Sequence, residues 1–171
     1  YDNRLLEGDV VVRYAQPDET LTLLNGQVLT LERDLLLVCD SVKPLGLAGI
    51  MGGEHSGIAD DTTSVYLEGA FWNPAVIQGK MRRLGFQSDA GYRFERGVDF
   101  ELGPRAVERA TQLILEICGG RAGPLRDSIG TLPARASTVA ALGAVLVAGV
   151  MAGTGGRTET ARVTGWLSAE A

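Results

Sequence analysis

The sequence predicts an α+β fold: a mostly antiparallel or mixed β-sheet with about two main helices packed on one face. Three observations favour this class. Apolar and β-branched runs of strand length crowd the chain up to Glu68, and helical patterns come only after them. An Asn-Gly pair marks a β-hairpin. Later in the chain, a long stripe of apolar residues at helical spacing stops at two glycines.

The strand signals begin after an early turn. Val10–Tyr14 is β-branched and reads as the first strand. Leu21–Leu24 and Gln27–Leu31 flank Asn25-Gly26, which predicts a hairpin with a two-residue turn at positive φ. Three more strands are expected, of which the first is a continuous apolar run typical of a fully covered strand. They are Leu35–Cys39, Leu45–Ile50 and Val65–Glu68.

Two helices are expected after these strands. The first covers Pro74–Leu84, because Asn73 suits a helix cap and proline suits the first helical position. The second runs through Ala106–Ile117, and Gly119-Gly120 ends it. Arg121–Ile129 is expected to return as a strand or extended segment.

The length of 171 residues suits one domain with a sizeable core. After Pro133 the composition shifts to Ala, Gly, Val and Thr with few charges. We therefore expect a main domain over residues 1–133 and a weakly specified Ala/Gly-rich tail over residues 134–171. The tail is predicted to be the least ordered part of the chain.

Composition narrows the classes of function. The net charge of −5 argues against strong non-specific binding of nucleic acid by the whole chain, although a local basic face remains open. Cys39 and Cys118 lie in apolar runs and are expected to be buried free thiols in a reducing cytosol. His55 is the one histidine, so no metal site is expected. The first residues show no signal peptide, and the apolar run Val139–Gly153 falls short of the roughly 20 residues that span a bilayer. A cytoplasmic protein without a membrane partner is expected.

Four glycines among small apolar residues, in the segment Gly46–Gly53, could bind a ligand through backbone groups. They could equally serve only turns and close packing, and residues alone leave the two readings equally open. Neither a dinucleotide nor a phosphate-binding fingerprint is present.

Glu68 closes its predicted strand beside small residues. Its carboxylate could be solvated, or could lie near the N-terminus of the next helix, where negative charge is favoured. Ser88 and Asp89, followed by Ala90, are typical of a turn that flanks a helix.

Arginines surround the same region. They could contact phosphates, with Tyr92 and Phe94 nearby for stacking, or could form surface ion pairs with Glu95, Asp89 or Asp99. They are Arg82, Arg83, Arg93 and Arg96.

Four linked motifs carry a family resemblance. GLAGIMGG, the LE of VYLEGAFWNP, RRLGFQSDA and YRFERGVD follow one another with matching order and spacing. Over Tyr1 to Pro133 the chain resembles the central, editing domain of the phenylalanine–tRNA ligase beta subunit of bacterial type, whereas the tail does not match. Tyr1-Asp2 resembles the end of a family motif whose histidine lies just upstream.

The resemblance implies residue roles in an editing pocket. Gly49 falls at a pocket glycine, and Glu68, 19 residues later, falls at a glutamate that helps to recognise tyrosine. Ser88 and Ala90 match a hydroxyl residue and a small residue that line the same pocket. The implied activity is hydrolysis of mischarged Tyr-tRNA(Phe) by a positioned water, and no catalytic residue is assigned.

The resemblance also implies the parent enzyme, a class II aminoacyl-tRNA synthetase that attaches phenylalanine to its tRNA with ATP and magnesium. No cofactor is expected in this fragment. The implied partners are the alpha subunit, tRNA(Phe) and the rest of the beta subunit. Because synthesis belongs to the other subunit, the isolated fragment is not expected to aminoacylate. The alternative is a non-catalytic scaffold or tRNA-docking module of the synthetase.

Overall fold

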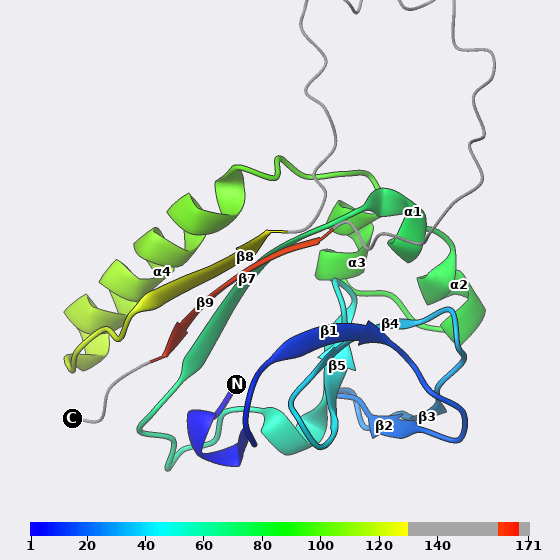
Figure 1. Cartoon of the computed structure of the whole chain (residues 1–171), viewed down its shortest axis with the longest axis horizontal. Coiled ribbons are helices and arrows are strands. Elements are labelled where there is room, and N and C mark those ends of the chain that lie inside the picture. Colours follow the sequence, from blue (N-terminus) through cyan, green and yellow to red (C-terminus); the bar gives the residue numbers. More distant parts are fainter. Residues whose placement is uncertain (130–160, 168–171) are drawn as a thin grey trace, which may run out of the picture.

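The structure is a computed structural model and describes residues 1–129 and 161–167. Its strands form a four-stranded sheet, a two-stranded hairpin and a three-stranded sheet, and the pairings within them are antiparallel (Figure 1). This confirms the α+β class and the antiparallel pairing. The expected strands are divided among three sheets rather than gathered in one.

The four-stranded sheet has the order β1-β4-β5-β6. Its strands are β1 (Val11–Tyr14), β4 (Leu36–Cys39), β5 (Pro44–Leu47) and β6 (Met51–Gly52). Every residue of β4 is buried, as its continuous apolar run predicts. This sheet supplies much of the hydrophobic core.

The hairpin joins β2 (Thr20–Thr22) to β3 (Val28–Thr30) and confirms the hairpin signal. Its turn is different from the one expected. The Gly26 N–H donates to the Leu23 carbonyl at 2.8 Å, and the Leu23 N–H donates to the Gln27 carbonyl at 2.9 Å. The loop therefore has three residues, of which Gly26 alone has a positive φ. Asn25 stays out of the left-handed region, and its side chain accepts from the Gln27 N–H instead.

The three-stranded sheet has the order β7-β9-β8, and α4 (Leu102–Cys118) lies against one of its faces (Figure 1). Its strands are β7 (Tyr66–Trp72), β8 (Leu125–Ile129) and β9 (Ala161–Leu167). Strand β9 comes from the predicted tail and pairs with both of its neighbours. The rest of the predicted tail, residues 134–160 and 168–171, lies outside the described residues, so the prediction of low order and the boundary at residue 133 remain predictions.

Strand β7 separates two packed regions. On the face towards α4, a side chain on Gly69 would collide with Val107, and the Phe71 ring lies edge-on to Phe100 with centroids 5.9 Å apart. Because successive side chains alternate across a strand, Glu68 and Trp72 point the other way. There Trp72 is fully buried in the hydrophobic core.

The predicted helix over residues 74–84 is two short helices, α1 (Pro74–Ile77) and α2 (Lys80–Leu84). Gly79 interrupts it with φ 77°, a left-handed conformation that breaks the helical hydrogen bonding. The start is as predicted, because the Asn73 side chain accepts from the Ala75 N–H. Helix α3 (Asp89–Phe94) follows, and α4 confirms the second predicted helix. Two 3₁₀ turns complete the elements, η1 (Asn3–Leu5) and η2 (Glu54–Ser56).

Both cysteines are free, as expected, but only Cys39 is buried. Burial in β4 raises the pKa of its thiol to about 11. The expectation of burial is wrong for Cys118, the last residue of α4, because the helix ends there beyond the part that packs on the sheet. Within the described residues, the helices are too short or too polar to cross a membrane.

Asp40 fixes the loop between β4 and β5. Its buried carboxylate accepts from the backbone N–H groups of Glu7, Val42 and Lys43 and from the Lys43 ammonium, at 2.7–3.1 Å. Burial alone would raise the pKa of this carboxyl. The hydrogen bonds outweigh burial and hold the pKa at about 2.

The conformational stability of the chain should therefore fall as the pH drops from about 4 towards 2. The sign follows from a folded-state pKa that lies below the unfolded value. Asp40→Asn should lower the free energy of unfolding by about 1–3 kcal/mol at pH 7, because the amide cannot accept from all four donors. It should also weaken the loss of stability between about pH 4 and pH 2. Urea unfolding at several pH values measures both effects. Asp60→Asn, at an exposed aspartate, is the control and should change neither; an unaltered loss of stability at low pH in Asp40→Asn would contradict the assignment.

Candidate functional site

The predicted pocket residues come from three segments that the fold brings to neighbouring places. Gly49 lies between β5 and β6, Glu68 on β7, and Ser88 immediately before α3. The Ser88 hydroxyl donates to the Ile50 carbonyl at 2.6 Å, which places the start of α3 against the glycine segment.

Gly49 has no room for a side chain. Its φ is 66°, and a Cβ there would lie 2.5 Å from Cδ1 of the Trp72 indole. Both features require glycine, so packing against β7 alone accounts for this residue. The same contact places Gly49 on the face of β7 that carries Glu68.

Ser88 caps α3. Besides donating to Ile50, its hydroxyl accepts from the Gly91 N–H at 3.0 Å. The helix-flanking role expected from sequence is therefore present, and both hydrogen-bonding functions of the hydroxyl are in use. Ala90 lies in the first turn of α3 and is exposed.

Glu68 is the third residue of β7, which begins at Tyr66. The expectation that it ends a strand is wrong, because the strand continues to Phe71 and Trp72, which are both buried. The Tyr1 phenol donates to Glu68 Oε2 at 2.6 Å. The rings of Tyr1 and Tyr66 lie beside one another with centroids 6.1 Å apart.

The surroundings of Glu68 shape its electrostatics. Burial raises the pKa of its carboxyl, and the hydrogen bond from Tyr1 opposes that rise. Burial and the Glu68 charge in turn raise the pKa of the Tyr1 phenol. The phenol therefore keeps its proton and is the donor of the hydrogen bond to Glu68. Glu68 is therefore a carboxylate whose described partner is a phenol.

Sequence reasoning did not select Tyr1 as a site residue. The contact depends on an isolated antiparallel bridge between Asp2 and Val65, with the Tyr66 N–H donating to the Tyr1 carbonyl at 3.0 Å. Partners 67 positions apart leave no local pattern that could have revealed the pair.

The four arginines fall into two classes. Arg83 forms ion pairs with Asp34 at 2.7 Å and with Glu32 at 3.5 Å, and Arg96 pairs with Glu95 at 2.7 Å. The pairing of Arg96 matches the ion-pair reading of the sequence. The other two, Arg82 and Arg93, are exposed and form no ion pair with any residue that the structure describes.

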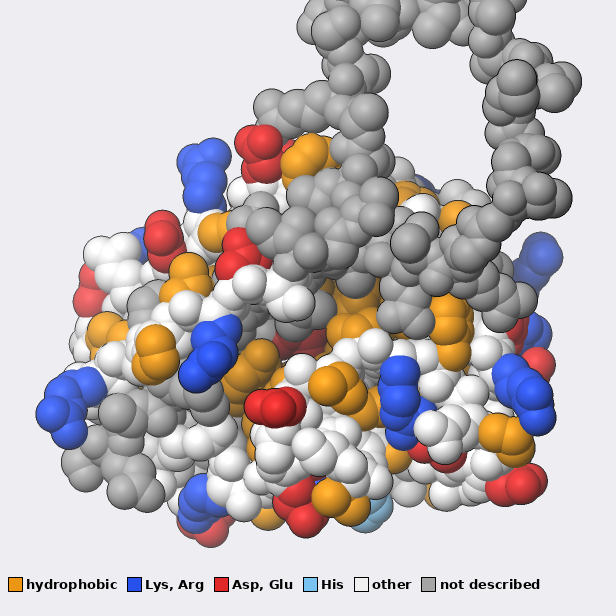
Figure 2. All heavy atoms as spheres, viewed as in Figure 1, with side chains coloured by type: hydrophobic (Ala, Val, Ile, Leu, Met, Phe, Trp, Pro, Cys, Tyr) orange, Lys and Arg blue, Asp and Glu red, His pale blue; other side chains and the backbone are white. Residues whose placement is uncertain are grey.

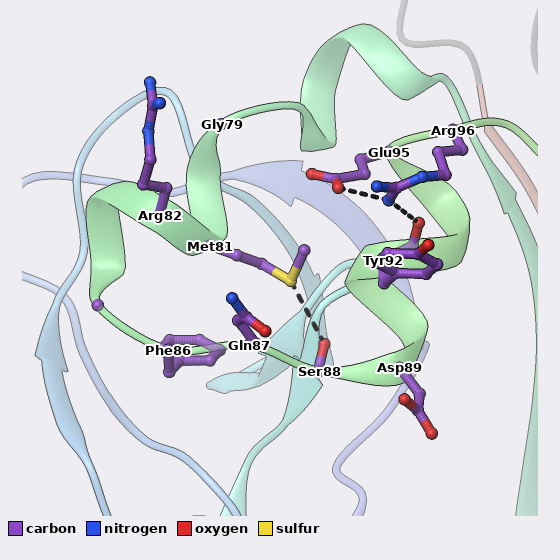
Figure 3. Close-up of a pocket in the computed structure, with 11 residues that line it drawn as sticks. Gly79, Met81, Arg82, Phe86, Gln87, Ser88, Asp89, Tyr92, Glu95 and Arg96 are labelled. Carbon is purple, nitrogen blue, oxygen red and sulfur yellow. Dashed lines mark hydrogen bonds and ion pairs between the residues drawn. The ribbon is translucent and has the colours of Figure 1, made fainter.

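A hollow of about 840 Å³ opens between α2 and α3 (Figure 3). Arg82 lies on its α2 side, Tyr92 and Arg96 lie on its α3 side, and Met81 and Ser88 lie between them. On the face drawn in Figure 2, cationic and anionic side chains are interspersed, without a large patch of one sign. Among the residues that the structure describes, no cluster of three or more His, Cys, Asp or Glu is arranged to hold a metal ion.

Comparisons with known proteins agree over most of the chain. Residues 1–119 match the family model of the B3/4 domain. The phenylalanine–tRNA ligase beta subunit of Dechloromonas aromatica is 52% identical over 164 residues, covering 90% of this chain and 21% of that subunit. The subunit of the same name from Aromatoleum aromaticum is 55% identical over 129 residues, covering 75% and 16%. That from Dickeya dadantii is 50% identical over 139 residues, covering 80% and 18%.

The chain thus spans about a fifth of the length of these curated relatives. The Dechloromonas match covers more of the chain than residues 1–133 make up. The expectation that the resemblance stops at Pro133 is therefore wrong, because the match continues into the predicted tail.

The contact between Gly49 and Trp72 should be measurable as stability. Gly49→Ala should destabilise the chain by about 2–4 kcal/mol, because it adds both an unfavourable φ and a clash with a fully buried indole. Gly85→Ala is a matched control: it also has positive φ, 78°, but no atom lies within 4 Å of the added Cβ. Chemical denaturation of both variants separates the two costs, and equal losses would show that the packing on Trp72 contributes nothing.

Proposed function

This chain belongs to the B3/4 domain family and to the phenylalanine–tRNA ligase beta subunits. We propose that it hydrolyses the ester bond that links a wrongly attached tyrosine to tRNA(Phe). Glu68 is the proposed acceptor for the tyrosine hydroxyl. Gly49, Ser88 and Ala90 are the proposed lining of the same pocket, since their segments lie beside one another.

The chemistry explains why a second site is needed. A pocket that binds phenylalanine through apolar contacts cannot strongly reject an analogue that only adds a hydroxyl. A second pocket must do the reverse and bind the hydroxyl itself. A partly buried carboxylate serves this purpose, because phenylalanine would leave one of its oxygens without a donor.

The observation that carries the proposal is the contact between Glu68 and the phenol of Tyr1, at 2.6 Å. It is the same pair of chemical groups that recognition of tyrosine requires. The carboxylate has a second oxygen, Oε1, which has no hydrogen-bond partner within residues 1–129 and 161–167. A ligand phenol can take that oxygen while Tyr1 holds the other.

For the reaction itself, we propose a water positioned at the ester, with no covalent protein nucleophile. The whole enzyme would attach phenylalanine to tRNA(Phe) with ATP and magnesium, which we assign outside this chain. Its partners would be the alpha subunit and the remainder of the beta subunit, in the cytoplasm.

A second candidate is a non-catalytic scaffold or tRNA-docking module of the synthetase. Two contacts favour it: Gly49 is required by Trp72, and the hydroxyl of Ser88 already caps α3 and binds Ile50. Selective hydrolysis distinguishes the two functions, since a scaffold would not separate tyrosine from phenylalanine.

The test is Glu68→Ala in a complete enzyme whose beta subunit carries this chain. A hydrogen bond to a charged group contributes roughly 1.5–3 kcal/mol, so the preference for Tyr-tRNA over Phe-tRNA in deacylation should fall about ten- to a hundred-fold. Synthesis of Phe-tRNA should hardly change. Rates of deacylation of both substrates are measured side by side for variant and wild type.

Glu108→Ala, which removes an exposed carboxylate on α4, is the matched control. Glu68→Gln separates charge from shape, because the amide keeps an accepting oxygen but loses the charge and should lie between wild type and Glu68→Ala. A Tyr/Phe ratio unchanged in Glu68→Ala would refute the proposed function and favour the scaffold.

A further inference from the structure

The hollow between α2 and α3 combines features that single nucleotides use for binding. On its α3 side, Tyr92 is 56% exposed. The Arg96 guanidinium lies 3.5 Å from the centre of that ring. It is held there by Glu95 Oε1 at 2.7 Å and by the Tyr92 carbonyl at 2.9 Å (Figure 3). The result is a planar, exposed and fixed stacking surface.

The α2 side of the hollow contributes a cation. Arg82 lies on α2, on the opposite side of the hollow from Tyr92 and Arg96, and its side chain points outward from the helix (Figure 3). Since it forms no ion pair with any described residue, its charge is available to an anion. Arg83, the next residue, is instead bound to Asp34 by two hydrogen bonds.

The hollow also lies next to the proposed editing pocket. Ser88 lines the hollow, and its hydroxyl donates a hydrogen bond to the carbonyl of Ile50, the residue after Gly49. A ligand in the hollow would therefore lie close to the glycine segment of that pocket.

Size and charge select the occupant. A volume of about 840 Å³ is within the range of small-ligand sites and fits one nucleotide rather than a duplex. Asp89 also lines the hollow, and Arg96 is already paired with Glu95, so Arg82 is the cation left for a phosphate. A surface that followed several phosphates would need more unpaired cations.

We propose that this hollow binds the terminal unpaired nucleotide of the tRNA whose ester the neighbouring pocket hydrolyses, a proposal that rests on the proposed function. The base stacks on the Tyr92–Arg96 surface, and Arg82 contacts the phosphate. The bound nucleotide places the attached amino acid towards Ser88 and Gly49.

The test uses the complete enzyme and two substrates, Tyr-tRNA and tyrosine methyl ester, which lacks the nucleotide. Tyr92→Leu should raise the KM for Tyr-tRNA roughly ten-fold, the usual effect of losing one stacked base, and should leave hydrolysis of the methyl ester unchanged. Tyr92→Phe keeps the ring and should restore the wild-type KM. Circular dichroism and thermal unfolding of each variant check that the domain stays folded.

The second variant is Arg82→Gln, with Arg93→Gln as its matched control. Both arginines are exposed and unpaired among the described residues, but Arg82 lines the hollow and Arg93 does not. Arg82→Gln should raise the KM for Tyr-tRNA more than Arg93→Gln does. It should also reduce the slope of log KM against log salt concentration by about one, the effect of losing one phosphate contact.

The proposal is overturned if Tyr92→Leu raises the KM for both substrates alike, or if Arg82→Gln and Arg93→Gln behave alike. In that case the proposed function still stands, provided that Glu68→Ala lowers the Tyr/Phe ratio. If Glu68→Ala leaves the ratio unchanged, the proposed function fails by itself. Binding of uncharged tRNA, with and without its last nucleotide, then decides the nucleotide site: the loss of affinity on trimming should disappear in Tyr92→Leu, and a loss that persists overturns the site.

Discussion

The contact between Trp72 and Gly49 holds the two halves of the fold together. Trp72 is the last residue of β7, is fully buried, and occupies the space that a side chain on Gly49 would need. The three-stranded sheet and the four-stranded sheet share no hydrogen-bonded strand pair among the described residues. Side-chain packing of this kind therefore fixes the position of β7, and with it of Glu68, relative to the glycine segment.

The alternation of side chains along β7 places the residues that pack the fold on one face and the candidate site residue on the other. Gly69 and Phe71 pack towards α4, where close contact leaves no space for a ligand. Glu68 points to the opposite face, where Tyr1 and Tyr66 surround it. A shift of β7 by one residue would exchange the two sets, so the packing of α4 on one face also determines which side chains reach the other.

The sequence predicted the features that depend on neighbouring residues. The Asn-Gly hairpin, the Asn73 cap and α4 all follow from local patterns, and the order of four motifs was enough to indicate the family. Contacts between distant segments were missed, because no periodicity encodes them. The phenol of Tyr1 on Glu68 and the insertion of β9 between β7 and β8 are of this kind. The glycine break at Gly79 was local, but a single glycine is compatible with either a helix or its end.

The place of Glu68 within its strand bears directly on the proposed selectivity. A carboxylate at a strand end can turn towards water when no donor binds it, and its preference for a phenol would then be small. Glu68 instead has a backbone position fixed by the pairing with Gly165, with two strand residues before it and four after it. One of its oxygens is held by Tyr1, which restricts rotation of the side chain. A half-buried carboxylate held in this way still carries a cost when one oxygen lacks a donor, and in the proposed site that cost would separate tyrosine from phenylalanine.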